Sequence, residues 1–374
     1  MTAALSKYNR IVIKVGSALL VDAKRGAVRE AWLKSLGKNI SDLLKAGKEV
    51  IIVSSGAIAL GRSTANFPDT DLRLEEEQAA ASIGQIMIDR AWQDALKQSE
   101  RHIGQVLITW DDTEKRRQFL NVRATINTLL KHKAIPLINE NDTVCTQEIR
   151  YGDNDRLSAR IATMANADAL ILLTDVDGLY SANPQKDPNA THFPLIEEIT
   201  PEIEAMATGA KSYLSRGGMA TKLEAGKMAM SGGVDMIIAS GLALNPLSSL
   251  NKDQKYTLFK SSIDSASARK SWLAGHMEVK GSVYIDAGAS KALLSGSSLL
   301  AAGVVTFEGN FERGDMVLIK NAEGLELAKG LIGYSVVDAK KIAGHRSEEF
   351  LDILGYPPRA AFIHRDDLVL LVGK

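Results

Sequence analysis

The sequence predicts an α/β protein, with an open, mostly parallel sheet sandwiched by helices and a small, mainly β domain after it. Three observations support this fold class. Residues 10–260 alternate short apolar runs with helix-like runs, as a parallel sheet covered by helices requires. Nearly every apolar run ends in a polar or glycine-containing cluster. From about residue 280 onward, short strands and turns replace this alternation.

The expected elements of the first part follow from these runs. Helix-like periodicity after residue 17 places Trp32, Leu36, Ile40 and Leu43 on one face and ends at Gly47. A long, alanine-rich helix is expected over residues 75–96. Because small residues such as Gly84 let another helix come close, it is either a buried core helix or a subunit contact. The expected strands cover residues 11–13, 49–53, 106–108, 135–138, 169–173 and 234–238.

The composition narrows the class of protein. The chain has 374 residues, of which 45% are hydrophobic and 24% charged, so it is globular and long enough for two domains. Lys+Arg and Asp+Glu both total 45, so the net charge gives no sign of a nucleic-acid or membrane partner. No apolar stretch has the length of a signal peptide core or a membrane span. We therefore expect a cytoplasmic protein.

The metal-binding residue types show no metal site. A single cysteine, Cys145, excludes an internal disulfide and a Cys-rich metal site, and we interpret it as a small residue in a strand rather than a reactive thiol. The six histidines have no metal-ligand spacing. The sequence therefore identifies no protein ligands for a metal.

Four polar clusters follow strands, at residues 14–17, 54–56, 139–142 and 174–175. In open α/β sheets, ligands bind outside the carboxyl ends of the strands. One such cluster would be unremarkable, but four predict a shared site.

The glycine-rich segment at residues 216–222 has the features of a phosphate-binding loop. Two glycines allow close approach of the backbone, and a helix begins beside a lysine. An ordinary loop with a solvated lysine is the alternative. Neither the P-loop pattern nor G-x-G-x-x-G occurs in the chain, so a P-loop NTPase and a dinucleotide-binding domain are disfavoured. Lys14 follows a buried strand, and with Lys222 and a magnesium ion it could meet the charge of phosphoryl transfer.

Residues 152–155 open a helix with more short polar side chains than a helix cap needs. A buried acid between the two lysines could fix both ammonium groups. Nearby acids and amides could hold the charged ends of an amino acid. Thr174 and Asp175 could accept a nucleotide's base or ribose, with a local Asx-type turn as the competing interpretation.

Six segments together carry a family resemblance. In order, they are KVGS (14–17), SSGAIALG (54–61), INEND (138–142), GDNDRLSA (152–159), LLTDVDGLY (172–180) and GGMATK (217–222). They resemble the glutamate 5-kinases of the amino acid kinase superfamily, whose bacterial members commonly carry a C-terminal PUA domain. The resemblance covers essentially the whole chain. It implies an amino acid kinase domain over residues 1–262, a linker over 263–279, a PUA-like domain over 280–360 and a tail over 361–374.

The resemblance also implies an activity: ATP-dependent phosphorylation of the γ-carboxylate of L-glutamate, the first step of proline biosynthesis, with Mg²⁺ and with feedback inhibition by proline. Lys14 and Lys222 would flank the phosphoryl group, aligned by Asp155. The implied glutamate pocket consists of Ser55, Gly56, Asn139, Asp142, Asp153 and Asn154. The implied nucleotide site consists of Lys14, Thr174, Asp175, Arg216, Gly217, Gly218, Met219, Ala220, Thr221 and Lys222. The family often has glycine and threonine where this chain has Ser215 and Arg216, so the nucleotide loop departs from the family pattern at these two positions.

Other members of the superfamily and one other class of protein remain as alternatives. Acetylglutamate kinase lacks the C-terminal domain, and aspartokinase usually carries regulatory domains of another pattern. PUA-like domains often accompany RNA modification, so RNA binding is the alternative from a different class. The resemblance further implies a homo-oligomer and, as the next enzyme, a separate glutamate-5-semialdehyde dehydrogenase.

Overall fold

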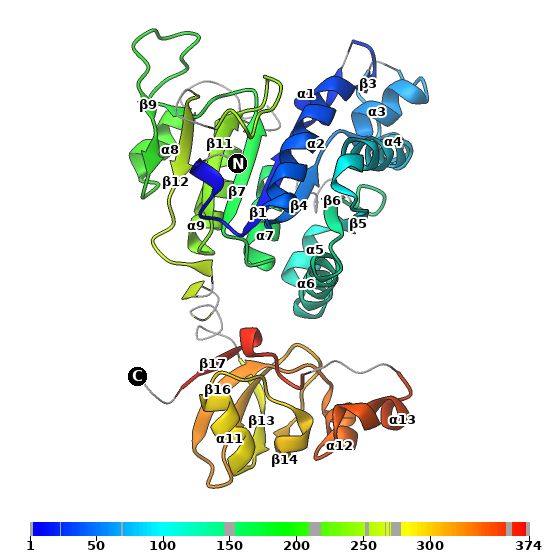
Figure 1. The fold of residues 1–374 in the computed structure, drawn as a ribbon, viewed down its shortest axis with the longest axis vertical. Coiled ribbons are helices and arrows are strands. Elements are labelled where there is room, and N and C mark those ends of the chain that lie inside the picture. Colours follow the sequence, from blue (N-terminus) through cyan, green and yellow to red (C-terminus); the bar gives the residue numbers. More distant parts are fainter. Residues whose placement is uncertain are drawn as a thin grey trace. The chain divides into compact units, whose positions relative to one another are not determined.

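The computed structural model describes residues 3–22, 24–68, 70–145, 154–208, 218–250, 254–265, 267–268, 270, 278–356 and 361–371. The chain divides into two compact units, Met1–Ser265 and Ala266–Lys374. Figure 1 labels the elements of both.

An eight-stranded sheet forms the centre of the first unit, in the order β10-β12-β11-β7-β1-β4-β6-β5. The strands from β11 to β5 are all parallel, and only the pairing of β12 with β11 is antiparallel. This confirms the predicted mostly parallel sheet. The bounds are β1 Arg10–Val15, β4 Glu49–Ser54, β5 Ile103–Ile108, β6 Ile135–Glu140, β7 Ala169–Thr174, β10 Leu195–Ile196, β11 Asp235–Ser240 and β12 Tyr256–Phe259.

Helices cover both faces of this sheet. Side chains of a strand alternate between faces, so Ile11 and Ile13 of β1 join one apolar core while Val12 joins the other. The first core is covered by α2 (Glu30–Lys45), α3 (Ala57–Thr64) and α4 (Leu74–Ala95), and the second by α6 (Arg116–Lys131), α7 (Asn154–Met164) and α9 (Met219–Ser231). Lys14 lies on the α7 and α9 side, because it shares the face of Val12.

The other elements of this unit are short. They are η1 Ala3–Leu5, α1 Ser17–Leu20, β2 Val21–Asp22, β3 Ala27–Val28, η2 Lys97–Ser99, α5 Trp110–Glu114, β8 Leu179–Tyr180, β9 His192–Phe193 and α8 Pro201–Thr208.

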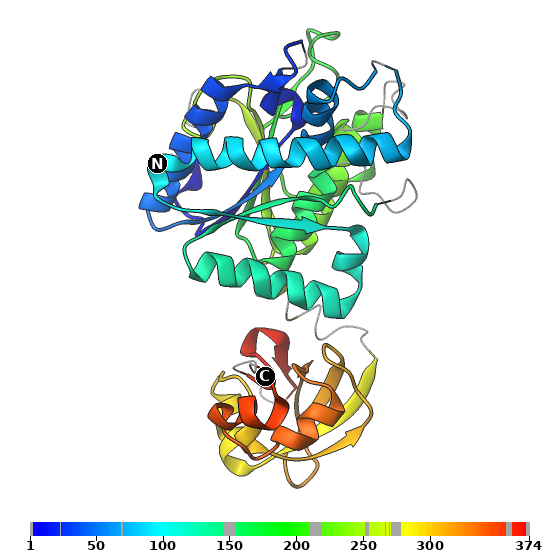
Figure 2. The same ribbon diagram turned by 90° about the vertical axis from the view of Figure 1, so that its right-hand side faces the viewer.

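The long helix α4 packs closely against α3. Figure 2 shows α4 lying across one side of the sheet. A Cβ added to Gly84 would lie 1.8 Å from the carbonyl oxygen of Ala57, and one added to Gly61 would lie 1.7 Å from that of Ala80. The small residues of α4 therefore accommodate a helix of the same chain. In the described part of the chain, α4 included, no helix is both long and apolar enough to cross a membrane.

Cys145 differs from its predicted setting. Its side chain is buried as expected, but it lies in the turn after β6 rather than in a strand. The strand ends at Glu140, because the chain turns there and the amides of Val144 and Cys145 bond back to the carbonyl of Asn141.

The second unit is built on a five-stranded sheet in the order β14-β13-β15-β16-β17, with mainly antiparallel pairing and its own apolar core. The predicted small β domain is confirmed. Its elements are β13 Val279–Ile285, α11 Ala287–Leu294, η3 Ala301–Gly303, β14 Val304–Gly309, β15 Met316–Lys320, β16 Glu326–Leu331, α12 Val336–Ile342, η4 Ser347–Glu349, α13 Phe350–Leu354, η5 Arg365–Asp367 and β17 Leu368–Leu370.

The segment expected to be a C-terminal tail differs from that expectation. Within its described part, residues 361–371, β17 pairs with β16. Phe362 is buried and stacks on Tyr334 at 5.7 Å between ring centroids. The buried ring of Phe362 and the pairing of β17 with β16 both stabilise this segment as part of the folded domain.

Candidate active site

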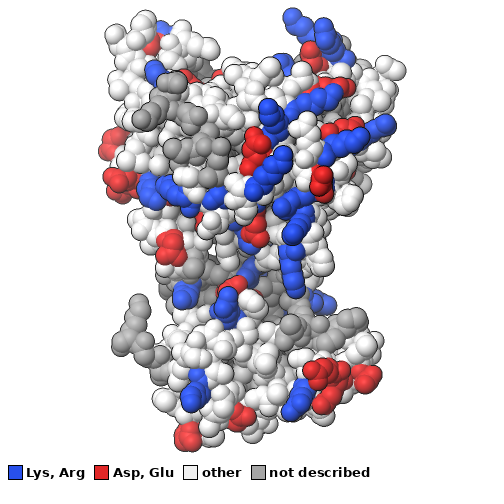
Figure 3. Space-filling view, in the orientation of Figure 1, with Lys and Arg blue, Asp and Glu red and all other residues white. Residues whose placement is uncertain are grey.

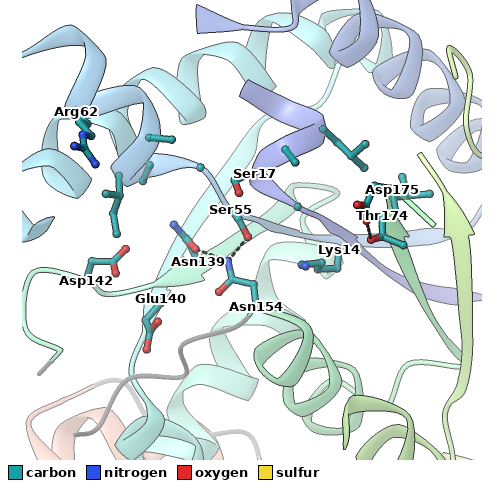
Figure 4. A pocket seen from close by; sticks show the side chains of 18 of the residues that line it. Lys14, Ser17, Ser55, Arg62, Asn139, Glu140, Asp142, Asn154, Thr174 and Asp175 are labelled. Atoms are coloured by element: carbon teal, nitrogen blue, oxygen red, sulfur yellow. Dashed lines mark hydrogen bonds between the residues drawn. The ribbon is translucent and has the colours of Figure 1, made fainter. Parts of the chain in front are cut away.

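A pocket of about 590 Å³ opens beyond the carboxyl ends of β7, β1, β4 and β6, which are neighbours in the sheet. Each of the four polar clusters singled out in the sequence contributes to its lining. Of the predicted site residues, those that line it are Lys14, Ser55, Gly56, Asn139, Asp142, Asn154, Thr174, Asp175 and Lys222. Figure 4 shows most of these side chains converging on the same space.

One end of the pocket is formed by a buried charged trio. Asp155, in the first turn of α7, is fully buried, and its Oδ1 lies 2.5 Å from Lys14 Nζ. Its Oδ2 lies 3.0 Å from Nζ of Lys222, a residue near the start of α9. Lys14 and Lys222 are only 7% and 5% exposed, so a carboxylate holds two cations side by side at the pocket wall.

The electrostatics of this trio favour the charged form of Asp155. Burial by itself raises the pKa of the carboxyl, but the attraction and hydrogen bonds of Lys14 and Lys222 outweigh that, and the pKa lies below its ordinary value. With the carboxylate ionised, the two ammonium groups leave an excess of one positive charge. Such a site is suited to an anion with several oxygens, such as a phosphoryl group.

The opposite end contains neutral amides and a hydroxyl, with Glu140 and Asp142 beside them. Asn154 Nδ2 donates to Ser55 Oγ at 2.7 Å and to Asn139 Oδ1 at 3.0 Å. Asn139 Nδ2 in turn donates to Gln85 Oε1 at 2.9 Å. Gly56 precedes α3 with a φ of 109°, a conformation that favours glycine. This end can place hydrogen-bonding groups around a small polar ligand.

Thr174 and Asp175 line the pocket at the end of β7. Thr174 Oγ1 donates to Asp175 Oδ1 at 2.9 Å. This bond joins two neighbouring side chains, whereas an Asx-type turn would bond the Asp side chain to a backbone amide. It leaves the second carboxylate oxygen of Asp175 as an acceptor for a ligand, so both interpretations remain.

The glycine-rich segment is described only in part, since Arg216 and Gly217 lie outside the described residues, as does Asp153. Gly218 caps α9, and Met219, Ala220 and Thr221 form its first turn, with Thr221 Oγ1 donating to the carbonyl of Gly218 at 2.8 Å. Of the described residues in this segment, Lys222 lines the pocket and these four do not.

Sequence reasoning missed several pocket residues. Ser17 and Glu140 belong to strand-end clusters but were assigned no role, and their position in those clusters was the signal that could have found them. Arg62 of α3 and Glu77 of α4 also line the pocket. Arg62 directly follows the segment at residues 54–61, which was the signal that could have found it. Glu77 lies in the first turn of α4, away from any strand end, and no local pattern marks it.

Three comparisons with known proteins show what this chain is similar to. A carbamate kinase from Giardia lamblia, solved bound to AMP-PNP, is 20% identical and covers 68% of this chain and 98% of its own, with a TM-score of 0.48. Glutamate 5-kinases from Brucella anthropi and Brucella ovis are each 56% identical over 370 residues, or 99% of this chain and 98% of theirs. Models of the amino acid kinase family and of the PUA domain match residues 9–240 and 281–354. By these last two findings, the chain belongs to the amino acid kinase family, as a kinase of the glutamate 5-kinase group with a C-terminal PUA domain.

Proposed function

We propose that this kinase transfers the γ-phosphoryl group of ATP to the γ-carboxylate of L-glutamate. The observation that carries the proposal is the pocket itself, which has a buried two-lysine end and an amide-lined end. The first suits a phosphoryl group and the second a small amino acid. The relatives that share 56% of the sequence bear the name glutamate 5-kinase, which supports glutamate as the acceptor.

The proposed roles of the residues follow from the difference between the two ends of the pocket. Lys14 and Lys222 meet the charge that grows on the phosphoryl oxygens, while Asp155 holds both ammonium groups in place. Glutamate occupies the other end, against Ser55, Gly56, Asn139, Asp142, Asp153 and Asn154. The nucleotide lies toward Thr174 and Asp175 and toward residues 216–222.

Mg²⁺ fits this site as a companion of the nucleotide. Among the described residues, no group of three or more His, Cys, Asp or Glu side chains is arranged to hold a metal. Mg²⁺ is usually held by one or two carboxylates together with substrate phosphates, and Asp175 is a carboxylate at the nucleotide end of the pocket wall. Bound there with ATP, it would neutralise phosphate charge.

The test is ATP consumption measured separately with L-glutamate, N-acetylglutamate, aspartate and carbamate. We expect glutamate to give the highest kcat/KM. Comparable turnover of N-acetylglutamate would move the assignment to acetylglutamate kinase, and a preference for aspartate or carbamate would reject the proposal outright.

The product of this reaction would be an acyl phosphate, which a separate glutamate-5-semialdehyde dehydrogenase would consume in proline biosynthesis. We also propose that proline inhibits the kinase, because it shares with glutamate an α-carboxylate and a charged nitrogen. Overlap at Asn139, Asp142 and Asn154 predicts inhibition that excess glutamate relieves. Initial rates over a grid of the two concentrations decide this, and inhibition that glutamate does not relieve would contradict overlap.

The visible surface charge does not favour RNA as the main partner. Figure 3 shows Lys and Arg residues intermixed with Asp and Glu residues over the first unit. Proteins whose main role is nucleic-acid binding gather positive charge on one face. Retention of RNA measured over a salt series tests this alternative, since binding through phosphates must weaken steeply with salt.

A further inference from the structure

The amide contacts of the pocket continue behind its wall. Gln85 Nε2 donates to Asp89 Oδ1 at 2.9 Å, and Gln105 Nε2 donates to Asp89 Oδ2 at 2.5 Å. Gln85 and Asp89 lie on α4 and neither lines the pocket. Gln85 is 8% exposed, Asp89 is half-buried, and Gln105 is exposed on β5. A hydrogen-bonded line thus runs from Asp89 through Gln85, Asn139 and Asn154 to Ser55.

The carboxylate at the start of this line determines its direction. An ionised carboxylate only accepts hydrogen bonds, so Gln85 must turn its NH₂ toward Asp89 and its oxygen toward Asn139. Asn139 must then turn its NH₂ toward Gln85 and its oxygen toward Asn154. Turning any one amide around would bring two acceptors or two donors together.

The last amide shows the consequence. Both hydrogens of Asn154 Nδ2 are used, one by Ser55 and one by Asn139. Only Asn154 Oδ1 remains for a ligand, and Figure 4 shows it on the side of the pocket where Glu140 and Asp142 lie. Ser55 Oγ accepts from Asn154, so its own hydrogen remains available for donation. The line therefore ends in one acceptor and one donor with fixed positions.

We propose that Gln85 and Asp89 are positioning residues, which fix Asn154 Oδ1 as an acceptor for the substrate's ammonium group and the Ser55 hydroxyl as a donor to its carboxylate. This inference rests on the proposed function, because it takes an amino acid as the acceptor substrate. It extends the specificity-determining residues to two positions of α4 that do not line the pocket.

The experiment compares two ligands in the full-length kinase. One is L-glutamate, measured by KM and kcat and by calorimetry without ATP, and the other is glutarate, which lacks the amine, measured as a competitive inhibitor. Gln85→Met and Asp89→Leu each break the line. We expect the KM and Kd for glutamate to rise about tenfold with kcat changed less than about twofold. The Ki for glutarate should rise several-fold less, because glutarate depends on the Ser55 donor but not on the acceptor for an ammonium group.

Two further variants separate positioning from general damage. In Asp89→Asn, the new oxygen can still accept from Gln85 while the exposed Gln105 turns to accept from the new NH₂, so glutamate affinity should stay near that of the unaltered enzyme. Gln93→Met makes the same change on α4 at a residue that bonds to the backbone of Arg101 and Ile103, outside the line. It should leave both ligands unaffected.

The outcomes are distinct. If Gln85→Met and Asp89→Leu leave glutamate affinity unchanged, or weaken glutamate and glutarate equally, the positioning role is overturned while the proposed function stands. If Asp89→Asn is as impaired as Asp89→Leu, the directional argument is wrong. An unaltered enzyme that neither binds nor phosphorylates glutamate rejects the proposed function, and this inference with it.

Discussion

The two ends of the pocket solve the problem of binding a polar ligand in different ways. At one end, Asp155 holds Lys14 and Lys222 by short ion pairs, all three almost fully buried. At the other, Asn139 and Asn154 are neutral and joined by hydrogen bonds whose direction is set from outside the pocket. One end presents two cations to a ligand, and the other presents hydrogen-bonding groups in a fixed orientation.

The difference shows what each end contributes. Burying an ion pair costs desolvation that its attraction often fails to recover, so the trio is poorly explained as a stabilising feature. Two cations kept at a pocket wall are better explained by a ligand whose negative charge increases during reaction. The amide end distinguishes ligands by where their donors and acceptors lie, beside the carboxylates of Glu140 and Asp142.

The largest expected effect tests the charged end. Lys222→Met or Lys14→Met should lower kcat about a hundredfold, equivalent to ~3 kcal/mol of transition-state stabilisation, with a much smaller change in the glutamate KM. Steady-state kinetics measures both parameters. Lys227→Met is the matched control, because Lys227 also lies on α9 but pairs with Glu204 at the surface, and its activity should be unchanged. Mild, equal effects on kcat and KM would make the lysines binding residues only.

The second prediction concerns the acid between them. Asp155→Asn leaves two buried ammonium groups without a counter-charge and should lower the free energy of unfolding by about 2 kcal/mol at pH 7. The folded-state pKa of Asp155 is lowered, so its contribution is present above the unfolded pKa of about 4 and is lost as the pH falls through the folded value. In urea unfolding measured from pH 7 downward, the free energies of unfolding of the unaltered protein and the variant should converge below about pH 4. A constant difference across that range would contradict this account.

The third prediction sharpens the amino acid end. Asp142 lines the pocket, and Asp142→Asn should raise the KM for glutamate about tenfold if its charge faces the substrate's ammonium group. N-acetylglutamate carries no such charge, so the binding of this poor ligand should barely change in the variant. Inhibition constants for the acetylated compound provide the comparison. An equal loss for both ligands would place Asp142 in a structural role.

The smallest expected effect concerns the second unit. All residues that line the pocket lie between Lys14 and Lys222, within the first unit. A chain ending after Ser265 should therefore keep kcat within about threefold, the size of effect expected without loss of a pocket contact. Activity assays are paired with a thermal melt to show that the shortened chain is folded. A folded but inactive chain would mean that the second unit completes the site.

Local sequence was sufficient for the fold class, the four strand-end clusters and six of the eight strands of the central sheet, and it missed β10 and β12 at one edge. The carboxyl ends of parallel strands lie at the same edge of a sheet, so polar residues that follow those strands must lie near one another. Lys14 and Asn139 could therefore be assigned to a single pocket. The second domain was likewise visible in its change of pattern. These features depend on the periodicity and order of the chain, which the sequence contains directly.

Only the tertiary structure decided which partners these residues have. Asp155 lies between its two lysines because α7 and α9 pack on the same face of β1. The link from Asn139 to Gln85 depends on how α4 lies over the sheet, since 54 residues separate the two. Contacts between residues so far apart depend on helix packing, which no local pattern determines. The sequence by itself thus determined which chemical groups gather at the pocket, and the packing of α4, α7 and α9 decided how they are paired and oriented.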